Sequence, residues 1–276
     1  VRTSSDTTLL NSLDVEVRQG DLLDLASLAE AFLGIDTIFC AVNIKLDGKT
    51  ISKYQEQIMS LHRQGTLNLI QASKASGVGR LIYFSSVAAI GYKKGVNIYN
   101  ESSPENPKDA YGIAKLTAEN ILKDASGDLD ITILRPPGVF GERGLGALTK
   151  VILFVEKGIV PIIGSGKNKQ SLTYVGNVIN QAVFLAKHQD AIGKTYIVTD
   201  KCAYSVNELV GAVSSARGKR IFKIHIPFWF VMISLPVLNF LGKIFLKKEF
   251  ISKESIVAIA TGRVFDGSKI QKELGY

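Results

Sequence analysis

Metal-binding and oxidisable side chains are scarce in this sequence. It has two cysteines, Cys40 and Cys202, and three histidines among 276 residues. The cysteines lie far apart without the spacing of metal ligands, and the histidines are isolated from one another. We therefore expect no metal site and no structural disulfide. A reducing compartment is the default for such a chain, and no secretory signal is visible, so we expect a cytoplasmic protein.

Acidic residues are few relative to basic ones. The sequence has 25 Asp and Glu against 33 Lys and Arg, which gives a formal net charge of +8. An excess of this sign points to an anionic partner, but the basic residues are scattered and lack the interleaved aromatic residues of a nucleic-acid binder. We therefore expect no nucleic acid. A dinucleotide, a phosphorylated substrate or an anionic membrane surface would each account for the charge.

The sequence lacks an apolar run long enough to span a bilayer. Its most apolar stretch, 226–246, is interrupted by Pro236 and Asn239 and is uncharged only as far as Gly242, whereas a spanning helix needs about 20 predominantly apolar residues. In one interpretation the stretch is a helical pair that packs inward and lines a substrate pocket. In the other, its aromatic face and the lysines after it bring residues 226–248 into peripheral contact with an anionic membrane; these lysines are Lys243, Lys247 and Lys248. Both interpretations favour an apolar substrate.

Short apolar strands alternate with helices along most of the chain. The predicted strands lie at 15–19, 36–42, 80–84, 132–134, 159–163, 171–174 and 193–199. The predicted helices lie at 4–13, 24–33, 51–76, 109–115 and beyond, 147–157, 177–187 and 205–216, the last opened by a capping box. This alternation is typical of an α/β fold with a doubly wound parallel sheet, in which ligands bind at the carboxyl ends of the strands.

The stretch from 80 to 115 carries the candidate chemistry. The strand 80–84 is followed directly by Ser85 and Ser86, and Tyr111 and Lys115 share one face of a later helix. A phenol with a pKa near ~10 is a poor acid or base at neutral pH, but an ammonium one helical turn away is expected to lower that pKa. Tyr111 is then the predicted proton donor and acceptor, and Ser86 orients a substrate oxygen. The pentapeptide alone also fits an ordinary packed tyrosine beside a solvated lysine, so its place after the strand is what favours catalysis.

Together with Arg135-Pro-Pro-Gly-Val-Phe-Gly141, these segments resemble the extended short-chain dehydrogenase/reductase family over nearly the whole chain. That family includes nucleotide-sugar epimerases and dehydratases, 3-beta-hydroxysteroid dehydrogenases and dihydroflavonol-type reductases. The resemblance implies a Rossmann-type sheet, NAD or NADP as cofactor, and a catalytic triad of Ser86, Tyr111 and Lys115. Lys115 would also hold the ribose of the cofactor.

The same resemblance implies where cofactor and substrate bind. Asp21 and Leu22 match the pair that contacts adenine, and further cofactor positions follow strand ends at Ala41, Val42 and Pro137. The implied substrate positions are Val87, Phe140 and Gln170. Arg2, beside the end of a strand near Val1, would lie by the adenosine ribose, where a guanidinium suits a 2′-phosphate. We therefore expect a slight preference for NADP.

Domain organisation and reaction follow from these assignments. We expect a dinucleotide-binding domain from 1–141 with parts of 171–200, and a smaller, interleaved α+β substrate domain from 142–170 and 201–276. The expected reaction interconverts an alcohol and a ketone by hydride transfer on a small-molecule substrate, with an apolar, steroid-like or dihydroflavonol-like substrate favoured. A nucleotide-sugar epimerase or dehydratase and a non-catalytic NAD(P)-binding sensor stay open as alternatives, and a homodimer is a further expectation.

The sequence departs from the family pattern at the phosphate-binding positions. The glycine-rich turn that cradles a pyrophosphate is not found upstream of the first predicted helix. We expect a fragment that lacks the first strand–helix unit; the alternative is a natural short form that never bound a dinucleotide. Gln170 stands where the nucleotide-sugar branch usually has a diphosphate-binding arginine, which a neutral amide cannot replace.

Two further departures concern the branch of the family. Val175-Gly-Asn177 and the terminal stretch 261–276 look closer to the hydroxysteroid-dehydrogenase and reductase branch. In the long helix, Leu61 and His62 displace a common asparagine, and we interpret His62 as a packed helix residue and not as a catalyst.

Overall fold

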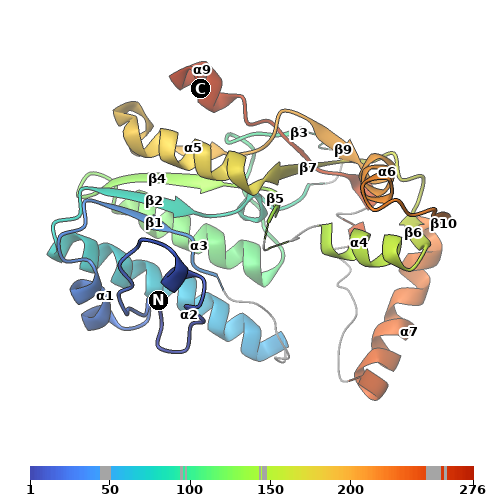
Figure 1. The fold of residues 1–276 in the computed structure, drawn as a ribbon, viewed down its shortest axis with the longest axis horizontal. Coiled ribbons are helices and arrows are strands. Elements are labelled where there is room, and N and C mark those ends of the chain that lie inside the picture. Colours follow the sequence, from blue (N-terminus) through green and yellow to red (C-terminus); the bar gives the residue numbers. More distant parts are fainter. Residues whose placement is uncertain are drawn as a thin grey trace.

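A four-stranded parallel sheet forms the centre of the chain. The computed structural model describes residues 1–43, 51–93, 96, 98–142, 144, 148–246, 256–257 and 260–276, with the backbone alone for 51–53, 237–238 and 240–246. The sheet has the order β1-β2-β4-β8, with the strands β1 (Thr37–Cys40), β2 (Arg80–Phe84), β4 (Asp130–Arg135) and β8 (Thr195–Ile197). All pairings are parallel, so the carboxyl ends of these strands meet at one edge of the sheet (Figure 1).

Helices cover both faces of this sheet. On one face lie α1 (Leu25–Ala31), α2 (Ile51–Ala75) and α3 (Ala110–Asp124), and on the other lie α5 (Val175–Lys187) and α9 (Lys269–Leu274) (Figure 1). Alternate residues of β2 serve the two cores: Leu81 and Tyr83 pack with α2 and α3, whereas Ile82 packs with α5 and α9. Apolar strand residues on both faces are the signature of a covered parallel sheet. The predicted doubly wound α/β fold is confirmed.

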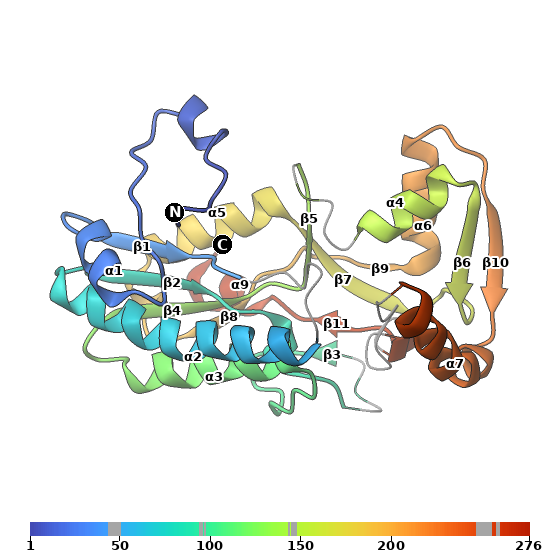
Figure 2. The same ribbon diagram turned by 90° about the horizontal axis from the view of Figure 1, so that it is seen from below.

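A second group of elements lies beyond the carboxyl ends of the sheet (Figure 2). It contains the sheet β5-β7-β9, with β5 (Gly138–Phe140), β7 (Lys169–Tyr174) and β9 (Ala203–Ser205), and the two-stranded sheet of β6 (Ile159–Ile163) and β10 (Phe222–Ile226). A short ladder joins β3 (Ile98–Tyr99) to β11 (Val264–Phe265). The helices of this group are α4 (Thr149–Glu156), α6 (Val206–Ala216) and α7 (Phe228–Leu246). The capping box predicted at Ser205 and Glu208 is present at the start of α6.

The first twenty residues differ from the prediction. Residues 15–19 form no strand, and Val15 and Val17 are 53% and 38% exposed. The short helix expected before them is reduced to the 3-10 turn η1 (Leu10–Ser12). A strand needs a neighbouring backbone for its hydrogen bonds. Residues 15–20 have two described backbone hydrogen bonds to Val1, both near the end of the stretch: the Gly20 amide donates to the Val1 carbonyl, and the Val1 ammonium donates to the Arg18 carbonyl.

The apolar stretch 226–246 also differs from the first interpretation. It continues β10 into one helix, α7, with Pro236 inside it, and not into a helical pair. Trp229, Phe230 and Ile233 are 63%, 53% and 70% exposed, so the described part of this helix does not pack its aromatic face inward. None of the helices in the described ranges is long and apolar enough to cross a membrane. Lys247 and Lys248 lie outside the described residues.

Candidate active site

The carboxyl ends of β2 and β4 hold the loop that carries Ser86. Ser85 donates its amide to the Leu134 carbonyl at 2.8 Å, and Val87 donates its amide to the Pro136 carbonyl at 3.2 Å. The hydroxyl of Ser86 caps the 3-10 turn η2 (Val87–Ala89) by accepting from the Ala88 amide at 3.1 Å. The loop is therefore fixed on both sides of Ser86, which sets the direction of its side chain.

Helix α3 is brought against this loop by a glycine. Asp109 caps the helix by accepting from the Gly112 amide at 2.9 Å. A Cβ at Gly112 would lie 2.5 Å from the Ala88 carbonyl oxygen, so only glycine lets the helix approach η2 this closely. Tyr111 stands directly before this contact, and the close approach places its phenol within hydrogen-bonding reach of Ser86.

The environment of Tyr111 raises its pKa, which contradicts the sequence-based expectation. Burial is the largest influence and raises the pKa of Tyr111 above 10, because a phenolate loses hydration there. Hydrogen bonding to Ser86 and Asn43 acts in the opposite direction without outweighing burial. Lys115, whose amine lies 5.8 Å from the centre of the Tyr111 ring, is not among the largest influences on this pKa. The phenol is therefore held in its protonated form, ready to donate a proton.

Lys115 is buried beneath the same strand end. It is 2% exposed, and its ammonium donates to the Phe84 carbonyl at 2.9 Å. Burial lowers the pKa of Lys115 from 10.5 to about 8, while Cys40 and Glu119 act in the opposite direction. At neutral pH the side chain is mostly an ammonium, positioned between the end of β2 and the ring of Tyr111.

A buried ion cluster that the sequence analysis missed holds the same elements together. Glu119, one helical turn after Lys115, is fully buried and accepts a hydrogen bond from the Ser85 hydroxyl. Arg135, at the end of β4, donates to Glu119 at 3.0 and 3.2 Å through its Nε atom and also binds Glu105. Helix α3 is thereby tied to the ends of β2 and β4. The sequence could have indicated this cluster, because the spacing of four residues between Lys115 and Glu119 places the carboxylate on the helix face that meets the sheet.

His62 is packed inside α2, as expected. It is 2% exposed, and its Nδ1 atom lies 3.0 Å from the hydroxyl of Tyr83. Burial and the charge of Lys115 lower the pKa of His62 from 6.5 to about 3, so the ring is neutral. Its Nε2 atom is buried without a hydrogen-bond partner.

Most of the predicted cofactor-binding residues line a cavity of about 500 Å³. Arg2, Asp21, Leu22 and Val42 line it, and Asn43, which bonds to Tyr111, lies at its border. It offers an apolar wall, a carboxylate and a guanidinium, a combination that fits the adenosine half of a dinucleotide. Ala41 is exposed at the end of β1 beside this cavity, whereas Pro137 and Lys115 lie at the neighbouring strand ends and do not line it.

The predicted substrate positions are not gathered at one point. Val87 directly follows Ser86. Phe140 lies on β5, paired with Tyr174 at the end of β7, whereas Gln170 lies at the beginning of β7. Phe140 and Gln170 are therefore separated by most of the length of a strand.

Arg263 lies beside Gln170 and was missed as a site residue. Its backbone pairs with β7 on both sides of Gln170, since the Arg263 amide donates to Lys169 and its carbonyl accepts from Ser171, each at 2.9 Å. The guanidinium is 5.5 Å from the ring centre of Tyr92, and its Nε atom is buried without a partner. Burial lowers the pKa of Arg263, and the nearby Tyr99 and Asp109 oppose the shift.

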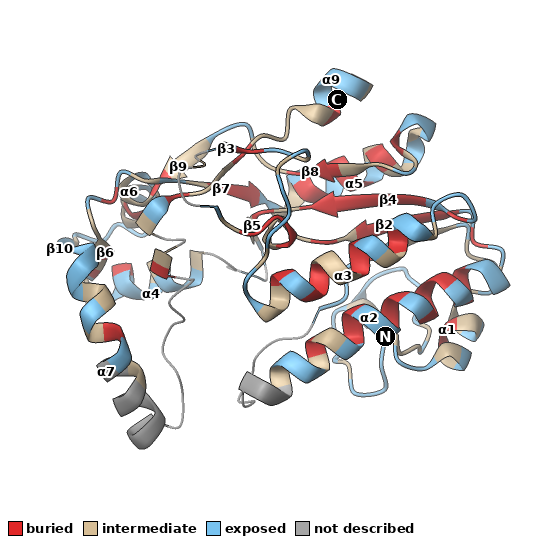
Figure 3. Cartoon of the chain, turned by 180° about the vertical axis from the view of Figure 1, so that it is seen from behind, coloured by how far each residue is buried: buried red, intermediate tan, exposed pale blue. Residues whose placement is uncertain are grey.

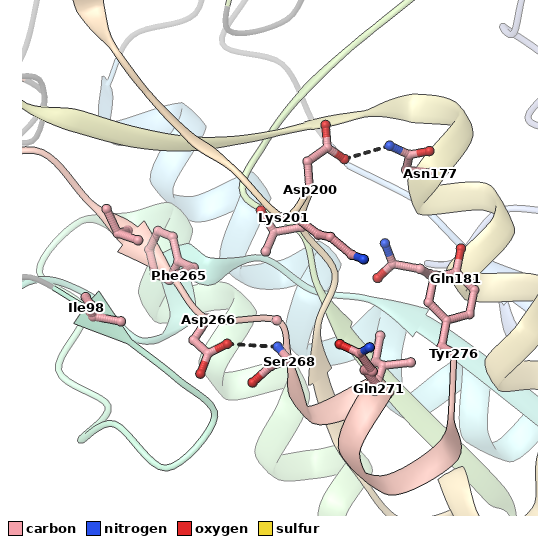
Figure 4. A pocket seen from close by; sticks show the side chains of 14 residues that line it. Ile98, Asn177, Gln181, Asp200, Lys201, Phe265, Asp266, Ser268, Gln271 and Tyr276 are labelled. Atoms are coloured by element: carbon pink, nitrogen blue, oxygen red, sulfur yellow. Dashed lines mark hydrogen bonds between the residues drawn. The ribbon is translucent and has the colours of Figure 1, made fainter.

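A second cavity, of about 710 Å³, is shown in Figure 4, and Ser86, Tyr111 and Lys115 do not line it. Asn177, Gln181, Asp200 and Asp266 line it, on the face of the sheet covered by α5 and α9. Asp200 accepts from Asn177 at 2.8 Å, and Asp266 accepts from the Ser268 amide at 2.9 Å. Asp200 is thus bound to α5 and Asp266 to its own turn, so we place the active site at the smaller cavity and the strand ends.

Comparison with known proteins agrees with this arrangement. The model of the NAD dependent epimerase/dehydratase family matches residues 1–199. The chain is 30% identical over 256 residues to N-acetyl-alpha-D-glucosaminyl-diphospho-ditrans,octacis-undecaprenol 4-epimerase of Escherichia coli O157:H7, covering 91% of this chain and 76% of that protein. It is 26% identical over 272 residues to 3-beta-hydroxysteroid dehydrogenase of Mycolicibacterium neoaurum, covering 93% and 74%.

Among solved structures, UDP-glucose 4-epimerase of Thermotoga maritima with UDP-glucose superposes with a TM-score of 0.75. The match covers 99% of this chain and 82% of that one at 19% identity, so it speaks for the fold alone. Some other curated relatives are matched over less than two thirds of their length. As its motifs predicted, the chain belongs to the NAD-dependent epimerase/dehydratase family of extended short-chain dehydrogenases/reductases.

Proposed function

We propose that the protein is an NAD(P)-dependent oxidoreductase that interconverts a secondary alcohol and a ketone. The observation that carries this proposal is the environment of Tyr111, a protonated phenol hydrogen-bonded to Ser86 and Asn43 above the buried ammonium of Lys115. A phenol placed in this way can give a proton to a carbonyl oxygen and take it back from a hydroxyl.

Each residue of the site has a defined task in this reaction. The nicotinamide supplies or accepts the hydride when the cofactor is bound. Tyr111 donates a proton to the substrate oxygen during reduction, and the Ser86 hydroxyl holds that oxygen in place. The positive charge of Lys115 stabilises the phenolate that remains on Tyr111. Asp21 and Leu22 bind the adenosine end, and Glu119 with Arg135 keeps the helix and the strand ends in register.

NADP is the cofactor that we favour over NAD. Arg2 lines the cofactor cavity and is exposed, so its guanidinium is free to bind a 2′-phosphate in a bidentate manner. Asp21 also lines the cavity, but its carboxylate accepts from the Leu23 amide at 2.9 Å and is therefore engaged in its own turn. Dissociation constants of the two reduced cofactors compare the two options, and tighter binding of NADH would reverse this preference.

The substrate that we propose is an alcohol or ketone with a large apolar part, such as a steroid-like or lipid-like compound. The printed names of both curated relatives describe such groups, a hydroxysteroid in one and an undecaprenol in the other. The test is a screen of the full-length protein on hydrophobic ketones and on UDP- and dTDP-sugars, following the absorbance of the reduced cofactor. We expect turnover of hydrophobic ketones. Turnover of sugar nucleotides alone would refute the substrate class, and cofactor binding without any turnover would favour the non-catalytic sensor.

A second candidate function is epimerisation of a sugar carried on a diphosphate, and Arg263 is the observation that favours it. The amide of Gln170 cannot bind a diphosphate as an arginine does. Arg263 is paired with Gln170 through the backbone, and the Nε atom of its guanidinium is buried without a hydrogen-bond partner. An epimerase would invert a sugar carbinol without net change in the reduced cofactor. Chromatographic analysis of the sugar after incubation with catalytic NAD separates this outcome from net oxidation.

A further inference from the structure

The two-stranded sheet of β6 and β10 has one apolar face that no described element covers. Val160 and Ile162 point toward α4 and α6 and form a buried core with them. Side chains alternate along a strand, so the other face carries cross-strand pairs of apolar residues. These pairs are Phe222 with Ile159, Ile224 with Pro161, and Ile226 with Ile163. Phe222, Ile159 and Ile224 are 69%, 52% and 42% exposed, which makes this an apolar surface and not a core.

Helix α7 adds further exposed apolar side chains next to the end of β10. One residue separates β10 from α7. The first turns of α7 carry Trp229 and Ile233 one helical turn apart, with Phe230 beside them. Each of these three side chains is more than half exposed. Figures 1 and 2 place α7 at the end of β10, and Figure 3 shows exposed residues on the described part of α7. Exposed aromatic and aliphatic side chains that gather in one region mark an interaction site.

Most charges around this surface are basic, and Glu156, which lies before β6, is paired with Arg217 and Lys219. The sequence from 217 to 248 contains basic residues but no aspartate or glutamate. Arg220 lies just before β10 and Lys157 precedes β6; both are exposed and make no ion pair with a described residue. Lys223, within β10, pairs with Val160 and therefore lies on the other face of the sheet. Aromatic and aliphatic side chains rimmed by unpaired cations suit a bilayer interface whose lipid headgroups are anionic.

We propose that the outer face of β6 and β10, together with Trp229, Phe230 and Ile233 of α7, docks on an anionic membrane surface. The apolar side chains enter the boundary between headgroups and acyl chains, and Arg220 and Lys157 bind lipid phosphates. The protein is peripheral in this arrangement. The surface is separate from Tyr111 and its neighbours, so it does not depend on the proposed reaction.

The test is co-flotation of the full-length protein with vesicles, without cofactor or substrate. We expect binding to vesicles of phosphatidylcholine with phosphatidylglycerol at low salt, and at least ~10-fold weaker binding to pure phosphatidylcholine or at high salt, because surface charges are screened. The double variant Trp229→Gln with Ile233→Gln removes two exposed apolar groups and should lower binding to anionic vesicles at least ~10-fold.

A matched control makes the same chemical change elsewhere. Ile179 and Val183 lie one turn apart on α5 and are 53% and 41% exposed, so Ile179→Gln with Val183→Gln should leave vesicle binding unchanged. Circular dichroism checks that both double variants are folded. Equal binding of the two double variants, or no binding of the wild-type protein at low salt, overturns the proposal. It is also overturned if light scattering shows a wild-type dimer that the α7 variant alone makes monomeric, since the surface is then a contact between two copies.

Discussion

The central sheet and the β6–β10 sheet use the same parallel pairing and differ in what covers them. In β2, four of five residues are buried because helices pack on both faces, whereas in β10 four of five residues are exposed. The difference follows from composition. Every residue of β2 between Arg80 and Phe84 is apolar, and the strand is placed between two layers of helices. In β10, Lys223 and His225 alternate with apolar residues and share the face of Val160 and Ile162, so the apolar residues of β10 lie on the outer face.

The charged groups of the two sheets also differ in their burial. In the central unit, Glu119 and Arg135 are at most 1% exposed and bind each other, so their charges are compensated inside the fold. A buried charge without a partner would be strongly unfavourable. Around the β6–β10 sheet, Lys223 and Arg220 are exposed cations. The first unit uses charge to fix the geometry of a site, and the second presents charge to the outside.

The largest expected difference between the two sheets is in stability. Ile82→Ala in β2 empties a fully buried position and should lower the free energy of unfolding by ~2–5 kcal/mol. The same change at Ile224 in β10, which is 42% exposed, should cost less than about 1 kcal/mol. Urea denaturation of both variants measures this contrast. Similar losses for the two would show that the outer face of β10 is a packed core.

A smaller effect of opposite sign is expected at the active site. Each pKa unit is worth ~1.4 kcal/mol, so a Lys115 pKa lowered to about 8 means that the buried ammonium opposes folding at pH 7. Lys115→Met should therefore raise the free energy of unfolding by ~1–3 kcal/mol at pH 7, after the lost hydrogen bond to Phe84 is subtracted. This advantage should shrink as the pH rises from about 8 to 10.5, where the wild-type amine becomes neutral in both states.

Lys74 provides the control for this prediction, because its side chain is exposed at the end of α2 and pairs with the exposed carboxylate of Asp128. Lys74→Met should change stability by less than about 1 kcal/mol at any pH in this range, since exposed ion pairs contribute little. Denaturation midpoints at pH 7 and pH 10 compare the two variants. An advantage of Lys115→Met that does not change with pH would contradict the lowered pKa of Lys115.

The parts of the fold that the sequence predicted are those with strong local signals. The strand 80–84, the cap at Asp109 and the helix that carries Tyr111 and Lys115 were placed correctly, because apolar runs and capping residues act locally. Residues 15–19 alternate like a strand but lack a described ladder partner, which alternation cannot reveal. β10 also alternates, with Lys223 and His225 between apolar residues, but the sequence analysis did not predict a strand there.

The electrostatics of the site depend on burial, which the sequence does not show. The spacing of Tyr111 and Lys115 predicted their common face, but not that burial would raise the pKa of the phenol and lower that of the amine. Arg263 is 93 residues after Gln170 in the sequence, and only the pairing of its backbone with β7 shows that the two are neighbours.

Deuterium transfer from reduced cofactor to substrate tests the central claim most directly. The full-length protein is incubated with a hydrophobic ketone and a cofactor deuterated on the transferred position, and the alcohol is analysed by mass spectrometry. We predict one deuterium on the carbinol carbon, and a rate ~10²–10⁴-fold lower in Tyr111→Phe, which retains cofactor binding but has no proton to donate. Tyr204→Phe on β9 serves as the control, with an unchanged rate. Label transfer at the wild-type rate in Tyr111→Phe, or none in a wild-type protein that binds the cofactor, would contradict the assignment.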